Sequence, residues 1–172
     1  SCNARVEVVP RIADIPAGAW DACANPDPAT FNPFLAHAFL KALEDAGTVG
    51  GRTGWMPQHL ALKTGADETI SACAPCYLKS HSQGEYVVDR GWAEAYEGAG
   101  GRYYPKLQIA VPFTPVPGRR LLVQPGPEAA NNAVLLASAG VQLVERNDLS
   151  GLHITFLTEA EWSALGDRGF LK

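Results

Sequence analysis

A strand, a long helix and a second strand follow one another between residues 106 and 157, and this order constrains the fold most. Residues 106–111 predict the first strand, residues 128–147 the helix and residues 152–157 the second strand. Strands of one sheet joined through a helix run parallel, with a right-handed crossover. Thr158-Glu159-Ala160-Glu161 then fits a capping box, which predicts that another helix begins there.

An antiparallel hairpin is predicted upstream of this unit. Residues 59–63 alternate as a strand, residues 64–69 form a polar turn, and residues 70–79 form the next strand. Earlier still, Asn32 and Pro33 are typical of a helix N-terminus. We therefore expect an α/β fold of the α+β kind, with a mixed central sheet and helices on both faces.

Size and composition fit one globular domain. Of the 172 residues, 47% are hydrophobic and 19% are charged, and a domain typically holds about 100–200 residues. We interpret residues 1–4 as a cloning remnant and residues 5–172 as a single domain. No run approaches the roughly 18 apolar residues of a membrane span, and no signal peptide is visible. Four cysteines without a secretory segment favour free thiols and a cytoplasmic location.

Charge and missing motifs exclude several classes of function. A net charge of −4 cannot supply the broad basic surface that nucleic-acid binding requires, although residues 79–120 carry six basic side chains against four acidic ones. The sequence has no P-loop, dinucleotide-binding glycine motif, zincin motif or nucleophile elbow. These absences argue against P-loop NTPases, Rossmann enzymes, zincins and α/β-hydrolases.

Residues 80–101 combine many glycines with aromatic side chains, and only a short helix at 92–99 is predicted among them. A long loop of this composition usually carries function. His81 lies among polar neighbours in this loop and is the best candidate for proton transfer. By contrast, His37 is expected on a helix surface and His153 within the sheet.

Basic and aromatic residues continue after this loop. Arginine and lysine side chains at Lys106, Arg119 and Arg120 could hold a phosphate or carboxylate group together with Tyr103 and Tyr104. The two tyrosines could equally pack against the start of the strand. Both interpretations remain open from the residues alone.

Cys73-Ala74-Pro75-Cys76 resembles a thioredoxin-type redox pair. That chemistry needs the first cysteine at a helix N-terminus, whereas these residues lie in a strand pattern. A zinc site through His59 or His81 would need four ligands at matched spacing. We therefore expect two buried structural cysteines and no metal site, with a thiol–disulfide oxidoreductase as a weaker alternative.

Several segments together match one known group of proteins. They are residues 80–86, 101–107 and 112–116, supported by residues 32–35, 152–156 and 164–170. In this combination the chain resembles, from about residue 6 to residue 172, the Fem-like peptidoglycan biosynthesis or recognition proteins of the GNAT (acyl-CoA N-acyltransferase) superfamily. The resemblance implies a GNAT-like fold. It also implies that a second GNAT-like unit follows in the parent chain.

The resemblance further implies amide-bond formation, in which an amine acceptor on a cell-wall precursor attacks an activated acyl or aminoacyl group. Acyl-CoA or aminoacyl-tRNA is the implied donor, and this half of the protein would mainly bind the acceptor. We expect His81 to transfer the proton. The residues expected to bind the acceptor are Lys79, Ser80, Ser82, Gln83, Tyr86, Arg102, Tyr103, Tyr104, Lys106, Phe113, Thr114, Arg119 and Arg120.

One departure from the GNAT pattern affects the donor. Aligned on Gly118, the loop that cradles the CoA pyrophosphate has Pro115 in place of Gln or Arg and Arg120 in place of Gly or Ala. A segment filled with prolines offers few backbone N–H groups to phosphates. The alternative is a non-catalytic module that recognises a peptidoglycan precursor or a partner.

Overall fold

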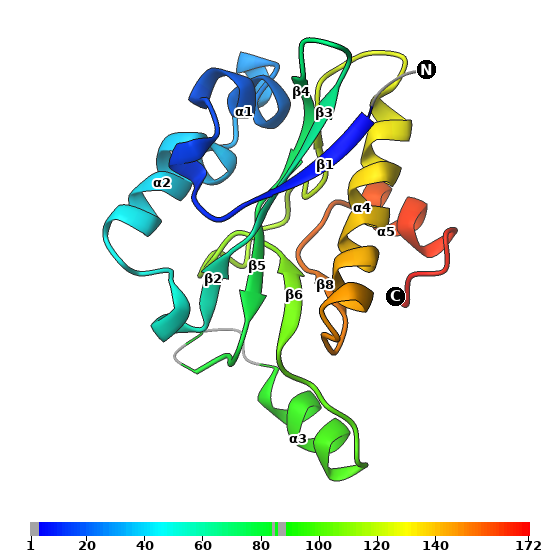
Figure 1. Cartoon of the computed structure of the whole chain (residues 1–172). Helices are drawn as coiled ribbons and strands as arrows, with labels where there is room; N and C mark the ends of the chain where they lie inside the picture. Colours follow the sequence, from blue (N-terminus) through cyan, green and yellow to red (C-terminus); the bar gives the residue numbers. More distant parts are fainter. Residues whose placement is uncertain (1–3, 84, 86–88) are drawn as a thin grey trace.

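The computed structural model describes residues 4–83, 85 and 89–172. Its helices and strands, in chain order, are β1 (Ala4–Val9), α1 (Ala17–Ala24), α2 (His37–Asp45), β2 (Trp55–Pro57), β3 (His59–Thr64), β4 (Thr69–Ala74), β5 (Cys76–Lys79), α3 (Arg90–Gly98), β6 (Lys106–Ile109), β7 (Leu122–Val123), α4 (Ala129–Arg146), β8 (Leu152–Ile154) and α5 (Glu159–Gly166). The mixed α/β fold expected from the sequence is confirmed (Figure 1).

The strands form two four-stranded sheets. One has the order β1-β3-β4-β7 and is antiparallel throughout, and the other has the order β2-β5-β6-β8. In the second sheet β6 and β8 pair in parallel, with Leu107 opposite Leu152 and Ile109 opposite Ile154. The parallel pair predicted from the strand–helix–strand order is therefore confirmed.

The predicted hairpin contributes strands to both sheets, because each of its two arms is interrupted once and divided into two strands. Pro75 ends β4 and separates it from β5, so the predicted strand 70–79 is two strands that belong to different sheets. Proline has no N–H to donate to a ladder, while its carbonyl accepts from the Ala110 N–H at 3.1 Å. On the other arm, Gln58 separates β2 from β3 and donates its N–H to the Cys76 carbonyl at 2.8 Å.

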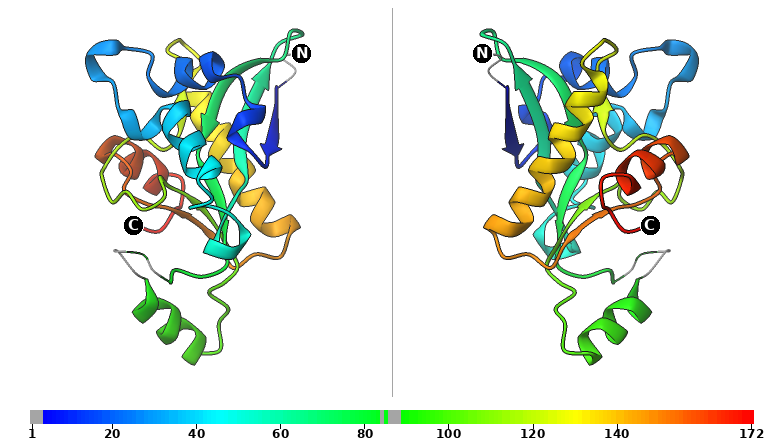
Figure 2. Two further views of the ribbon diagram at one scale, coloured as in Figure 1. Left: turned by 90° about the vertical axis from the view of Figure 1, so that its left-hand side faces the viewer. Right: turned by 90° about the vertical axis from the view of Figure 1, so that its right-hand side faces the viewer.

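Helices cover both faces of the first sheet (Figure 2), whereas the one mixed sheet expected from the sequence is divided into two sheets, of which the second is mixed. Alternate residues of β3 face opposite sides. Ala61 belongs to a core cluster with Trp20 of α1 and Leu40 of α2, whereas Leu60 and Leu62 belong to a cluster with α4. The helix α3 projects from the lower end of the molecule, between β5 and β6 in the chain (Figure 1).

Two local predictions have different outcomes. Thr158 and Glu161 form the predicted capping box at the start of α5. Asn32, however, caps a 3-10 turn over Pro33–Leu35, in which its side chain accepts from the Phe34 N–H at 3.0 Å. The helix α2 begins only at His37, because Ala36 has extended backbone angles that end the 3-10 turn. Within the described ranges, no helix combines the length and apolarity needed to cross a membrane.

Candidate functional site

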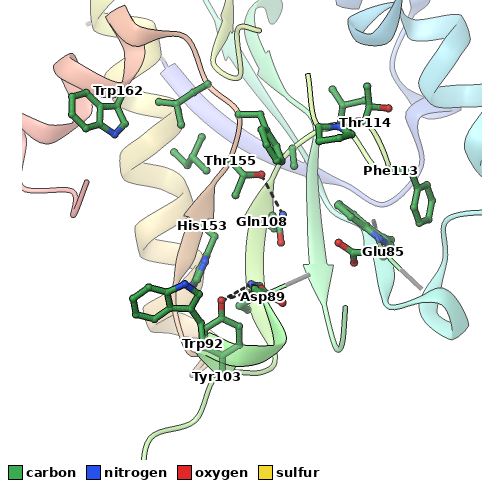
Figure 3. A pocket seen from close by; sticks show the side chains of 18 residues that line it. Glu85, Asp89, Trp92, Tyr103, Gln108, Phe113, Thr114, His153, Thr155 and Trp162 are labelled. Atoms are coloured by element: carbon green, nitrogen blue, oxygen red, sulfur yellow. Dashed lines mark hydrogen bonds and ion pairs between the residues drawn. The ribbon is translucent and has the colours of Figure 1, made fainter. Parts of the chain in front are cut away.

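A cavity of about 540 Å³ runs along β6 and β8 and past their carboxyl ends (Figure 3). The parallel strands end at the same edge of their sheet, so the loops that follow them meet there, as in other ligand-binding α/β sheets. This volume suits a small ligand. The cavity is lined by Trp55, Glu85, Asp89, Trp92, Tyr103, Lys106, Gln108, Ala110, Val111, Phe113, Thr114, Pro115, His153, Ile154, Thr155, Phe156, Leu157 and Trp162.

Two buried lysines lie opposite each other, and one of them, Lys106, lines the cavity. Lys79 of β5 pairs in register with Lys106 of β6, and both are almost completely buried. Two like charges in this arrangement need counter-charges. The segment between the two strands supplies them, because Lys79 Nζ bonds to the Glu85 carboxylate and Lys106 Nζ to the Asp89 carboxylate. We call these four residues the lysine–carboxylate cluster.

Asp89 accepts hydrogen bonds from three side chains. The Tyr103 hydroxyl donates to Oδ2 at 2.9 Å, the Tyr104 hydroxyl donates to Oδ1 at 2.8 Å, and Lys106 Nζ donates as well. Burial alone would raise the pKa of Asp89, but the bonds from Lys106 and Tyr104 outweigh burial and hold it well below its usual range. Burial lowers the pKa of Lys106, and Asp89 offsets only part of that shift.

The lysine–carboxylate cluster is consequently neutral as a whole. Burial and Asp89 raise the pKa of Tyr103, which therefore remains a neutral donor. Both ammonium groups also lie over aromatic rings, Lys79 at 3.9 Å from the Trp55 centroid and Lys106 at 4.3 Å from that of Tyr103. The charges of this cluster are thus satisfied within the protein.

His153 lies on the wall of this cavity. It is in the sheet, as predicted, with its ring 5.5 Å from that of Tyr103. Burial, reinforced by Lys106, lowers the pKa of His153 to about 4, so its imidazole is neutral near pH 7. His37, expected on a helix surface, is instead buried, with Nε2 2.8 Å from the Ile12 carbonyl oxygen.

Four exposed aromatic side chains surround the cavity, and we call them the aromatic rim. Trp92 comes from α3, Trp162 from α5, Phe113 from the loop after β6, and Phe156 from the loop after β8. Their exposed fractions are 78%, 46%, 45% and 37% respectively. Large apolar side chains gathered at a concave site are typical of ligand binding.

The structure brings only some of the predicted acceptor-binding residues to the cavity. Tyr103, Lys106, Phe113 and Thr114 line it. Behind this lining, Lys79 bonds to Glu85, and the Ser82 hydroxyl lies 2.7 Å from that of Tyr104. A ligand-binding role for these residues stays a prediction. Tyr86 lies outside the described residues.

His81 and its neighbours lie away from the cavity lining. The His81 ring packs against Gly54, where an added Cβ would lie 2.8 Å from Cε1, and its Nδ1 accepts from the Gln83 N–H at 3.3 Å. Ser80 donates its N–H to the Gly54 carbonyl at 3.4 Å. The structure therefore gives His81 no contact with the cavity that would support proton transfer there.

The three arginines predicted to bind the acceptor, Arg102, Arg119 and Arg120, bond to the protein itself. Arg120 is 1% exposed, and its guanidinium donates to the carbonyls of Thr155, Val116 and Arg119 at 2.9–3.1 Å. Arg119 donates to the carbonyls of Cys23 and Ala24, and Arg102 bonds to Asp148. Buried carbonyls without ladder partners need such donors. None of the three arginines lines the cavity.

The cysteine motif has no features of a redox pair. Cys73 and Cys76 are fully buried and lie in different core clusters. Burial raises the pKa of both thiols, which opposes thiolate chemistry. No group of three potential metal ligands occurs among residues 4–83, 85 and 89–172, and His59 Nε2 lies 2.8 Å from a Glu44 carboxylate oxygen.

The segment after β6 does not fit a CoA pyrophosphate. Pro112, Pro115 and Pro117 have no N–H group. The N–H groups of Thr114, Val116 and Gly118 donate to carbonyls of Val111, Thr114 and Phe156. A phosphate cradle needs free N–H groups directed at the ligand, and these six residues offer none.

Sequence reasoning missed Glu85, Asp89 and the tryptophans of the rim. One signal was present. A lysine that ends one strand and a lysine that begins the next need counter-charges, and the intervening loop offers Glu85 and Asp89 shortly after Lys79. Trp162 had no such signal, because the fold brings α5 to the cavity through long-range packing.

Comparisons with known proteins give one match. A family model described as FemAB-like, peptidoglycan biosynthesis/recognition, matches residues 11–172. Neither the curated proteins nor the solved structures include a match to the chain.

Proposed function

The chain belongs to the FemAB-like family of peptidoglycan biosynthesis/recognition proteins, and on this premise we propose that its cavity binds the amine acceptor, a peptidoglycan precursor, for an amide-forming acyl transfer. The observation that carries the proposal is the cavity itself, which lies along the paired parallel strands β6 and β8. It combines an aromatic rim with buried polar groups, the usual composition of a small-molecule site.

The described residues support positioning of the acceptor more than proton transfer. In amide formation an uncharged amine attacks an activated carbonyl, the CoA thiol or tRNA hydroxyl leaves, and a nearby base removes a proton from the amine. Asp89 is a weak base here, because three donors hold its carboxylate. His153 is neutral near pH 7, and with a pKa of about 4 it accepts a hydrogen bond more readily than a proton. Holding the precursor in one orientation is the contribution that this geometry favours.

Binding is tested by calorimetry with a UDP-muramyl pentapeptide, acyl-CoA and an aminoacyl-tRNA as separate ligands. We expect the pentapeptide precursor to bind and the Gln108→Ala variant to bind it more weakly, because Gln108 lines the cavity and bonds to Thr155. Gln142→Ala, on the exposed surface of α4, is the matched control. No binding of the precursor would refute the proposal. Binding of acyl-CoA alone would favour a simple acetyltransferase.

A recognition module without catalysis is the second candidate, favoured by the engaged N–H groups of Thr114, Val116 and Gly118. The two functions differ in their product. Mass spectrometry of the precursor, incubated with each donor, detects the mass of an added acyl or aminoacyl group. Precursor binding without that product indicates recognition alone.

A further inference from the structure

We propose that the part of the precursor held in the cavity is an uncharged sugar ring, stacked by the aromatic rim. The inference rests on the proposed function and names the chemical portion that the cavity recognises. A pyranose has a face of C–H groups that stacks on aromatic rings and hydroxyl groups that hydrogen-bond at its edges. Each of these two requirements is met by separate residues of the cavity.

Two members of the aromatic rim have a backbone conformation that costs free energy. Phe113 has a φ of 58° and Phe156 a φ of 54°, in the left-handed region that residues with a Cβ rarely adopt. Both side chains are only partly buried, so burial of the phenyl rings offsets the strain incompletely. Strained residues of this kind gather at ligand sites. These two follow the neighbouring parallel strands β6 and β8 and line the same cavity.

The aromatic rim surrounds polar groups on several sides. Figure 3 shows Trp92 and Phe113 on opposite sides of the polar side chains, with Trp162 above Trp92. Between them lie Gln108 and Thr155, joined by a hydrogen bond of 3.3 Å. Such neutral side chains suit hydroxyl and acetamido groups, which both donate and accept.

A buried indole also lies at this cavity. The indole of Trp55 lines the cavity and is 2% exposed. Its Nε1–H finds no acceptor within the described part of the chain. Buried N–H groups are normally satisfied, but this nitrogen is itself buried, so a ligand oxygen would reach it only after the indole moved.

The charges around the cavity argue against an ionic ligand. Both lysines of the lysine–carboxylate cluster already bond to carboxylates, and the Asp89 carboxylate accepts from three donors. The guanidinium groups of Arg119 and Arg120 bond to backbone carbonyls. A phosphate or a peptide carboxylate would have to displace an internal partner. A neutral ring keeps every one of these bonds.

The test uses the chain with neutral N-acetylglucosamine oligomers, the stem pentapeptide, UDP and the complete UDP-muramyl pentapeptide, each titrated by calorimetry. We expect the neutral oligomer to bind with an affinity that does not fall at high salt, because no charge pairing is involved. Phe113→Ala and Trp92→Ala should each weaken binding about fivefold. Phe31→Ala, which removes an exposed phenyl ring that does not line the cavity, should leave it unchanged. Circular dichroism verifies that each variant is folded.

The outcomes separate this inference from the proposed function. If the complete precursor binds while the oligomer does not, the sugar inference is overturned and acceptor binding stands. The sugar inference is also overturned if the oligomer binds equally well to wild type and to both rim variants. If neither the precursor nor the oligomer binds, both are overturned.

Discussion

Replacing Asp89 by asparagine should destabilise the protein strongly, although the substitution keeps the side chain's shape. Lys106 has a side chain only 2% exposed and would lose its carboxylate partner. Breaking a buried pair in this way costs about 3–5 kcal/mol, because one charge is left buried without a partner. The Tyr103 ring, 4.3 Å from Nζ, retains some stabilisation of the ammonium. We therefore expect a loss near the lower limit, about 3 kcal/mol.

A double-mutant cycle with Lys106→Met separates the pair from its surroundings. Lys106→Met alone should cost about 1–2 kcal/mol, because Asp89 remains partly exposed and keeps two tyrosine donors. The double variant buries no unpaired ammonium, so it should lose about 2 kcal/mol, less than Asp89→Asn alone. Urea unfolding at pH 7, followed by far-UV circular dichroism, measures all three. Additive losses, or a loss below about 1 kcal/mol for Asp89→Asn, would refute the reasoning.

The pH dependence provides a further readout of the same pair. The folded-state pKa of Asp89 is lowered, so its stabilisation is fully present above the ordinary aspartate pKa of about 4 and is lost as the pH falls below it. Asp89→Asn should remove that acid-side loss. If the variant loses as much stability at low pH as the wild type, groups other than Asp89 cause that loss.

Three further predictions concern the rim, a buried arginine and the histidine of the cavity. Phe113→Gly should be about 1 kcal/mol more stable than Phe113→Ala in urea, because glycine removes the cost of a φ of 58°; the opposite order would show that no strain is present. Arg120→Met should lose about 3 kcal/mol through unsatisfied carbonyls, whereas Arg102→Met, with a half-exposed side chain, should lose less than about 0.5. The pKa of His153 is lowered to about 4 in the fold, so the neutral imidazole makes its full contribution to the free energy of unfolding above pH ~6.5. At pH 5 the unfolded state binds a proton that the folded state does not, and the free energy of unfolding is lower by about 2 kcal/mol. Urea unfolding of His153→Gln should lack that part of the decline.

Features that depend on neighbours in the chain could be predicted from the sequence. The capping box at Thr158 and Glu161 needs only residues three apart and is confirmed. The hairpin and the parallel pair follow from periodicity and element order. The division of strand 70–79 is different, because Pro75 ends one ladder but does not say that the chain continues in a second sheet.

The candidate site was less predictable, because it depends on contacts between distant residues. Arg120 satisfies the carbonyl of Thr155, 35 residues away, and this competition for a donor is invisible in a linear pattern. Arg120 follows a proline-rich loop and was therefore predicted to bind a ligand. In the structure its hydrogen bonds are taken by backbone carbonyls of the irregular segments around it. Asp89 lies 17 residues before Lys106, so only closure of the loop brings the two together.

The interrupted hairpin has a consequence for the way the molecule unfolds. Its arms run β2–β3 and β4–β5, so the same two stretches of backbone contribute strands to both sheets. Neither sheet can lose its ladder without releasing strands of the other, which makes them a single cooperative unit. Native-state hydrogen exchange should give the amides of Leu62 in β3 and Leu78 in β5 the same opening free energy. The strands β6 and β8 that carry the cavity should therefore open only when the whole fold unfolds. The projecting helix α3, which carries Trp92, should unfold locally with a lower free energy of opening.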